Sequence, residues 1–157
     1  MKHSNERKEV TIMSHAETAV EYYNNNFNCS QGVFAAFATE LGIDEKLALR
    51  LGTNFGGGER KGELCGAVAG ALMVLGLQYG HCESDDFEGK AKAYRISEEF
   101  MNRFIEKNGS VVCRELLGYD LTKDEDLKII QNGNLFRTFC PKMLRSAADI
   151  LDEIINE

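Results

Sequence analysis

The side chains best suited to chemistry in this sequence are its five cysteines, Cys29, Cys65, Cys82, Cys113 and Cys140. A cysteine can serve as a buried small apolar residue, as a metal ligand or as a redox-active thiol. Permanent disulfides are rare in a reducing compartment. Metal ligation and thiol redox chemistry are therefore the functional interpretations to weigh against simple burial.

Four of these cysteines fall in the first turn of an expected helix. Asn28 can cap a helix that begins near Cys29, and Pro141 suits the first position of a helix that Cys140 caps. Cys65 begins an apolar run, and Cys113 lies three residues after an expected cap at Ser110. The unpaired N–H groups and the dipole at a helix start stabilise an anion. This position predicts a lowered pKa for each of the four thiols.

The spacing of the four cysteines limits the chemistry that they can share. They are far apart in the sequence, and no two of them form a Cys-x-x-Cys motif. Neither a zinc ribbon nor a thioredoxin-type dithiol is therefore indicated. A shared site would be assembled from four separate helices. Four thiolates are the usual ligands of an iron–sulfur cluster, and they could equally form two thiol/disulfide pairs or bind one zinc ion.

Residues 62–77 are expected to form the central helix, because they are almost entirely apolar and small. Gly62, Gly66 and Gly70 recur every four positions and would lie on one face, where another backbone or a bulky inorganic group can approach closely. The preceding glycine-rich segment 52–62 lacks the pattern of a phosphate-binding loop. We expect it to be a close-fitting turn that orients the helix.

The remaining pattern predicts an all-α fold, a compact bundle of about seven helices without a sheet. No segment alternates strictly between apolar and polar residues for more than four positions, and the chain has one proline. Ser14 and Glu17 have capping-box spacing at the start of the first helix. A further helix is expected to follow Asp44. Others are expected to run from the cap Ser84 to Asn108, over 110–118, from the cap Thr122 to Asn132, and from Cys140 to Ile155. Residues 1–13 show no period and are expected to be a mobile arm, which leaves a single helical domain over 14–157.

Composition excludes several classes of function. The net charge of -7 argues against nucleic acid as a partner, and Arg60–Lys61 is the local basic pair that stands out. The uncharged run 64–77 is shorter than the roughly 20 residues of a membrane span, so no membrane span is expected. The polar residues 1–13 lack the apolar block of a secretory signal, which indicates a cytoplasmic protein.

Histidine provides no hydrolytic site in this sequence. His3, His15 and His81 lie in the arm, in a first helical turn and in a polar loop, and none has a partner placed for a nucleophile. Cys82 follows His81 directly, and adjacent residues rarely bind one ion, so we expect both to be incidental surface residues. Whether the protein is an enzyme stays open at this point.

The cysteine pattern resembles that of the C_GCAxxG_C_C family, small bacterial and archaeal domains described as redox-active. Residues 65–70 match the Cys-Gly-Ala-x-x-Gly core, with Cys29 before it and Cys113 and Cys140 after it. Phe55 to Gly58, Cys113 to Gly118 and Cys140–Pro141 resemble further features of the family. Cys82 lies outside the pattern.

The resemblance implies a redox or metal-binding role for Cys29, Cys65, Cys113 and Cys140. A related domain lies beside haem-binding segments in split-Soret-type cytochromes, which favours an iron centre, with an iron–sulfur cluster as the leading cofactor and zinc or no cofactor as alternatives. Family genes often neighbour transporter genes, so the redox partner is expected to be transporter-linked. A homo-oligomer is left open. The competing functions are a thiol/disulfide oxidoreductase that uses Cys65 and a structural or partner-binding helical domain.

Overall fold

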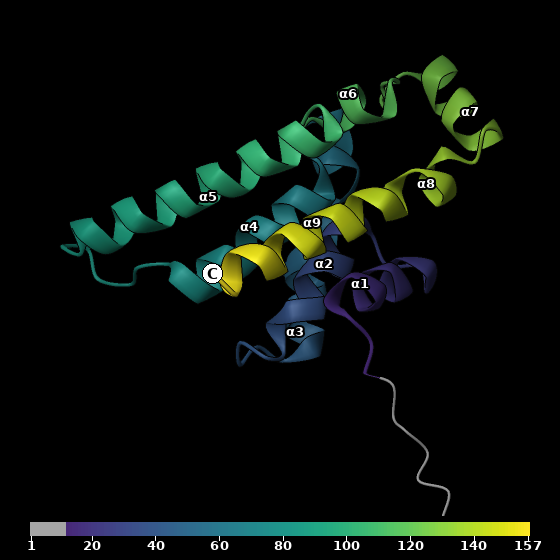
Figure 1. Cartoon of the computed structure of the whole chain (residues 1–157). Coiled ribbons are helices and arrows are strands. Elements are labelled where there is room, and N and C mark those ends of the chain that lie inside the picture. The colour runs from purple at the N-terminus through teal and green to yellow at the C-terminus, as the bar shows by residue number, and fades with distance from the viewer. Residues whose placement is uncertain (1–11) are drawn as a thin grey trace, which may run out of the picture.

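The computed structural model describes residues 12–157, which fold as an all-α protein (Figure 1). Apart from one isolated antiparallel bridge between Leu64 and Val112, these residues form no strand. The prediction of an all-α fold without a sheet is therefore confirmed. The expected mobile arm at residues 1–13 lies almost entirely outside the described residues, as does His3. The elements are α1 His15–Asn24, α2 Cys29–Ala38, α3 Glu45–Gly52, η1 Thr53–Phe55, η2 Gly58–Gly62, α4 Gly66–Tyr79, α5 Phe87–Asn108, α6 Cys113–Leu117, α7 Asp124–Asn132, α8 Leu135–Thr138 and α9 Cys140–Ile155.

The centre of the core is the contact between α2 and α4, with α1 and α9 packed against α2. Phe37 of α2, Val68 of α4 and Leu144 of α9 are buried in this core. Gly70 allows the two central helices to approach, because a Cβ there would stand 2.6 Å from the carbonyl oxygen of Ser30. Close helix packing therefore explains Gly70 without any ligand.

The expected central helix starts later than its glycine spacing suggested. α4 begins at Gly66, and Gly62 lies outside it with a φ of 68°, so the predicted three-glycine face is wrong at its first position. Only a glycine adopts this left-handed conformation without a steric cost. Gly62 therefore belongs to the turn that leads into the helix.

The second half of the chain adds the long outer helix α5 and the consecutive helices α8 and α9. α5 packs against α4 and α9 (Figure 1). It buries Phe100 and Phe104. α8 is a short helix that the sequence did not predict, and it leads directly into α9. No helix in the described range combines the length and the apolar character of a membrane span.

Three of the predicted helix starts depend on the side chains expected to cap them, namely Ser14 for α1, Asn28 for α2 and Asp44 for α3. Ser14 and Glu17 form the predicted capping box, and Asp44 accepts from the N–H of Leu47.

Four further starts differ from prediction. α6 begins at Cys113 after Val112 rather than after the expected cap Ser110, and Cys140 is the first residue of α9 rather than its cap. α5 begins after Asp86 rather than Ser84, and α7 begins at Asp124 because the N–H and hydroxyl of Thr122 both donate to Asp120. A side chain engaged with the preceding residues cannot cap the following helix.

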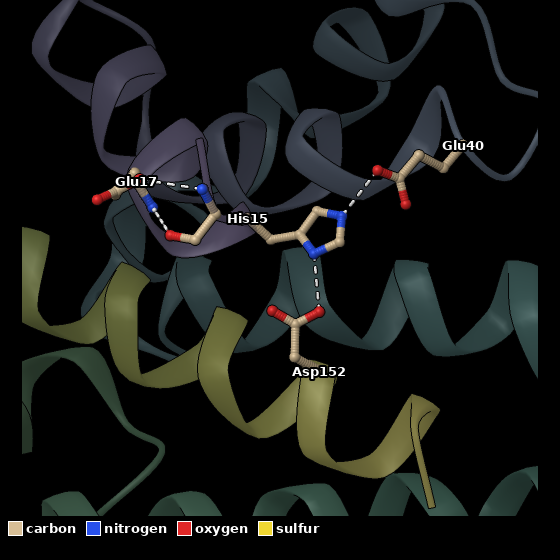
Figure 2. A network of polar contacts seen from close by, with 5 residues as sticks. His15, Glu17, Glu40 and Asp152 are labelled. Atoms are coloured by element: carbon tan, nitrogen blue, oxygen red, sulfur yellow. Dashed lines mark hydrogen bonds and ion pairs between the residues drawn. The ribbon is translucent and has the colours of Figure 1, made fainter. Parts of the chain in front are cut away.

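His15 lies between two carboxylates (Figure 2). One carboxylate follows α2 and the other lies near the end of α9, two helices that begin at cysteines. Its Nδ1 is 2.7 Å from Asp152 of α9, and its Nε2 is 3.0 Å from Glu40 after α2. The ring also stacks on Phe37, with centroids 4.0 Å apart. These contacts tie α1 to α2 and α9, which gives His15 a structural role.

Candidate functional site

The four cysteines of the sequence pattern line one cavity of about 380 Å³. Cys29, Cys113 and Cys140 are the first residues of α2, α6 and α9, and Cys65 is the residue that caps α4. The structure thus brings together thiols from four helix starts, as the sequence predicted. Cys82 is exposed in the loop between α4 and α5 and does not line this cavity.

Cys29 is positioned by a network around the start of α2. Asn28 and Gln31 form a capping box, and their amides also donate to the carbonyl oxygens of Thr53 and Leu49. A Cβ at Gly56 would stand 2.6 Å from the side chain of Asn28. The glycine-rich segment therefore wraps closely around the start of α2, which agrees with the predicted close-fitting turn.

A short antiparallel bridge places Cys65 next to Cys113. The N–H of Cys65 donates to Val111 at 2.7 Å, and the N–H of Cys113 donates to Glu63 at 2.5 Å. These two hydrogen bonds flank the Leu64–Val112 bridge. Because the bridge joins the residues just before α4 and α6, it aligns the starts of the two helices.

Tyr23 at the end of α1 fixes the surroundings of Cys140. Its hydroxyl donates to the carbonyl oxygen of Phe136 at 2.6 Å and also interacts with the thiol of Cys140. Burial, followed by the neighbouring Cys140 thiol, raises the pKa of Tyr23 well above its usual range. The phenol therefore stays protonated and remains a hydrogen-bond donor beside the cavity.

The segment from Gly57 to Gly62 has an unusual backbone. Positive φ angles occur at Gly57, Gly58 and Gly62 and also at Glu59 and Arg60, with φ of 55° and 61°. Such a conformation costs roughly 1–2 kcal/mol for a residue that carries a Cβ. This left-handed turn lies against Cys113, because a Cβ at Gly58 would stand 2.9 Å from the Cβ of that cysteine.

The prediction of lowered thiol pKa values is wrong for all four cysteines. Burial raises the pKa of Cys113 to about 11 and of Cys140 to about 12, and it raises the pKa of Cys29 and Cys65 as well. The N–H groups of Gly57, Ser30 and Gly66 lower the pKa of Cys29 only in part. Desolvation of the anion outweighs the helix-start effect.

The pKa shifts also indicate that the four thiols are close to one another. After burial, a charge on Cys29 is the next cause that raises the pKa of Cys65, Cys113 and Cys140. Like charges raise one another's pKa only when they are close. The four sulfur atoms therefore share one electrostatic environment.

Gly66 is the glycine with the most direct contact to the candidate site. A Cβ at Gly66 would overlap the sulfur of Cys29 and would stand 3.0 Å from the carbonyl oxygen of Phe55. The glycine in the Cys-Gly-Ala-x-x-Gly core thus gives the Cys29 sulfur room beside α4. This is the close approach that the glycine spacing predicted, here made by a thiol.

The sequence interpretation missed the rest of the cavity wall. Its apolar part consists of Phe27, Leu116, Leu117, Phe136, Phe139 and Met143. Its charged residues are Arg60 and Arg137. Arg60 belongs to the basic pair that stood out in the sequence, and its position in the glycine-rich segment 52–62 was a signal that it could lie at the site. No feature of the sequence indicated that Arg137 would line the cavity.

Within residues 12–157, no three His, Cys, Asp or Glu side chains are gathered as a set that could hold one metal ion. Ligands of a single zinc ion all lie about 2.0–2.3 Å from it, so they must meet at one point. The ligands of an iron–sulfur cluster bind different iron atoms and are spread around a larger group. The donor set here, four thiols around a cavity, fits the second arrangement better.

The fold and the cavity define an all-α protein in which thiols from four helix starts line one cavity. A family model described as "Putative redox-active protein (C_GCAxxG_C_C)" matches residues 27–154, most of the chain. The protein belongs to the C_GCAxxG_C_C family, as its cysteine pattern predicted. No curated protein and no solved structure matched the chain.

Proposed function

We propose that the protein holds an iron–sulfur cluster on Cys29, Cys65, Cys113 and Cys140 and serves in electron transfer or redox sensing. The observation that carries the proposal is the meeting of these four thiols around one cavity. The redox-active description of the family agrees with this role. When bound, such a cluster supplies a redox couple whose potential depends on hydrogen bonds to its sulfurs and on solvent exposure.

The chain's own groups suit this role. The N–H groups of Gly57, Ser30 and Gly66 point at the sulfur of Cys29, where they would stabilise a ligating thiolate. Cys65 is 7% exposed, so water has little access to that side of the cavity. Burial disfavours free thiolates here, and this cost is removed when the sulfur binds a cation.

The thiol/disulfide oxidoreductase remains the alternative, and the electrostatics of the cavity oppose it. The attacking species in thiol exchange is the thiolate. Raised pKa values keep the four thiols protonated near neutral pH. An unchanged count of alkylatable thiols before and after mild reduction would exclude this alternative.

The test is the iron and sulfide content of protein purified anaerobically, together with its visible absorption. We expect a coloured protein in which Cys→Ser substitution at any of the four positions lowers the iron content severalfold. Cys82→Ser is the matched control, because Cys82 is exposed outside the cavity, and it should retain its iron. A colourless protein with no iron or sulfide after reconstitution would reject the proposal. If all five variants kept the same metal and redox behaviour, the structural alternative would be favoured.

A further inference from the structure

The charged side chains that line the cysteine cavity have the opposite sign to the net charge of the protein. The chain has 25 acidic and 18 basic residues, yet in the described part of the chain no Asp or Glu lines the cavity. Arg60 and Arg137 line it instead. The charged side chains that line the cavity are therefore positive, in a protein whose net charge is negative.

Neither arginine is neutralised by a carboxylate within residues 12–157. The ion pairs found there involve His15, Arg103 and Arg114. Arg137 donates to the amide oxygen of Asn26 at 3.3 Å, which leaves its charge uncompensated. An arginine without a carboxylate partner keeps its donors free for a planar anion such as a carboxylate.

Arg60 is held over the cavity by its backbone. Its guanidinium folds back over Gly57, since a Cβ at Gly57 would stand 2.7 Å from Nη1 of Arg60. Its positive charge lowers the pKa of Cys113, against the neighbouring Glu59 carboxylate, which raises it. The left-handed φ of 61° at Arg60 is a costly conformation that glycine would adopt freely. A strained residue beside a cavity is typical of a functional position.

The depth of the cavity suggests how a ligand would lie in it. Arg60 and Arg137 are exposed, whereas Cys65 is buried, so the arginines lie nearer the opening. Aromatic and aliphatic side chains, among them Phe27, Phe136 and Leu117, form the wall. An apolar wall with a few charged groups is the usual composition of a small-molecule site.

We propose that this cavity binds a small organic anion that has an apolar body, with its charged group at Arg60 and Arg137. The inference goes beyond the proposed cluster and does not require it, since both arginines and the apolar wall belong to the chain itself. An inorganic anion would use the arginines and leave the apolar wall without a contact. A neutral apolar molecule would leave both guanidinium groups without a partner.

The test is calorimetric titration of the reduced full-length protein with benzoate, using protein as isolated and after metal removal. Benzamide is the neutral analogue, and inorganic phosphate is the anion without an apolar body. We expect benzoate to bind at least tenfold more tightly than either. Arg60→Gln and Arg137→Gln should each weaken benzoate binding at least tenfold. Lys61→Gln removes the same charge next to Arg60, outside the cavity lining, and should bind like the wild type.

Equal binding of benzoate and benzamide, or benzoate binding that neither arginine substitution weakens, would overturn the inference. The inference would also be overturned if the arginine variants lost iron and the iron-free wild type bound no benzoate. The arginines would then only balance the charge of the cluster. Iron content separates this inference from the proposed function. Benzoate binding in a protein that never retains iron would support the cavity inference and reject the cluster. A protein that retains iron but binds no benzoate with or without its metal would support the cluster and reject the cavity inference.

Discussion

At the scale of single residues, the candidate site depends on one missing side chain as much as on the four thiols. Gly66 leaves room for the sulfur of Cys29 and brings its own N–H group to that sulfur. Gly76, in the same helix, has nothing within 4 Å of the position where a Cβ would stand. Alanine substitution at both glycines raises helix propensity, but only the substitution at Gly66 also disturbs the candidate site. Comparing the two variants therefore separates these two effects.

We predict that Gly66→Ala displaces Cys29 and lowers iron retention severalfold in protein purified anaerobically. The overlap should also destabilise the fold by about 1–3 kcal/mol. Gly76→Ala should instead stabilise the protein by about 0.5–1 kcal/mol and keep its iron. Iron analysis and urea unfolding of both variants provide the measurement. Normal iron retention in Gly66→Ala would show that Cys29 does not depend on this contact.

At the scale of helices, the cysteine cavity and the His15 network lie at different parts of the same elements. Cys29 starts α2 and Cys140 starts α9, whereas Glu40 follows α2 and Asp152 is near the end of α9. His15 joins both helices to the first turn of α1 (Figure 2). The network therefore holds the relative positions of two helices that supply thiols.

We predict that His15→Ala lowers the free energy of unfolding by about 1–3 kcal/mol, because two charged hydrogen-bond partners and an aromatic contact are lost together. Chemical denaturation would measure this change. His81→Ala is the control, since His81 is exposed in a loop and should change stability by less than about 0.5 kcal/mol. Equal stability of both variants would mean that the interactions of His15 are fully replaced by water.

At the scale of the whole molecule, burial of the cavity sets the protonation of its thiols. A free thiol in an unfolded chain has a pKa near 8.5. In the fold, burial raises the pKa to about 11 for Cys113 and about 12 for Cys140. At a pH between the pKa of the unfolded chain and the raised pKa of the fold, the unfolded chain releases thiol protons that the folded chain keeps. The unfolding free energy therefore falls as pH rises through this interval.

We predict that the metal-free, reduced protein has its full thiol contribution to stability below about pH 8.5 and loses it progressively above that pH. Urea unfolding over a series of pH values would measure the loss. A Cys113→Ser/Cys140→Ser variant should lose less stability over the same pH interval than wild type, and Cys82→Ser should follow the wild type. The same pH slope in the double variant and the wild type would contradict the effect of burial.

The sequence by itself determined most of the helices, three of their caps and the family cysteines, because these depend on local spacing and on short motifs. Ser14 and Asn28 cap the helices that they were expected to cap, and the four cysteines lie at helix starts. Cys82 was set apart correctly, since it does not line the cavity.

Only the tertiary structure decided the environment of the thiols. Helix starts alone indicated lowered pKa values, but desolvation depends on what surrounds each sulfur, and burial reverses the shift at Cys29 and Cys65. Arg137 and Phe136 come to the cavity through the short α8, which had no clear sequence signal. Distances between residues far apart in a chain follow from packing, which local spacing does not encode.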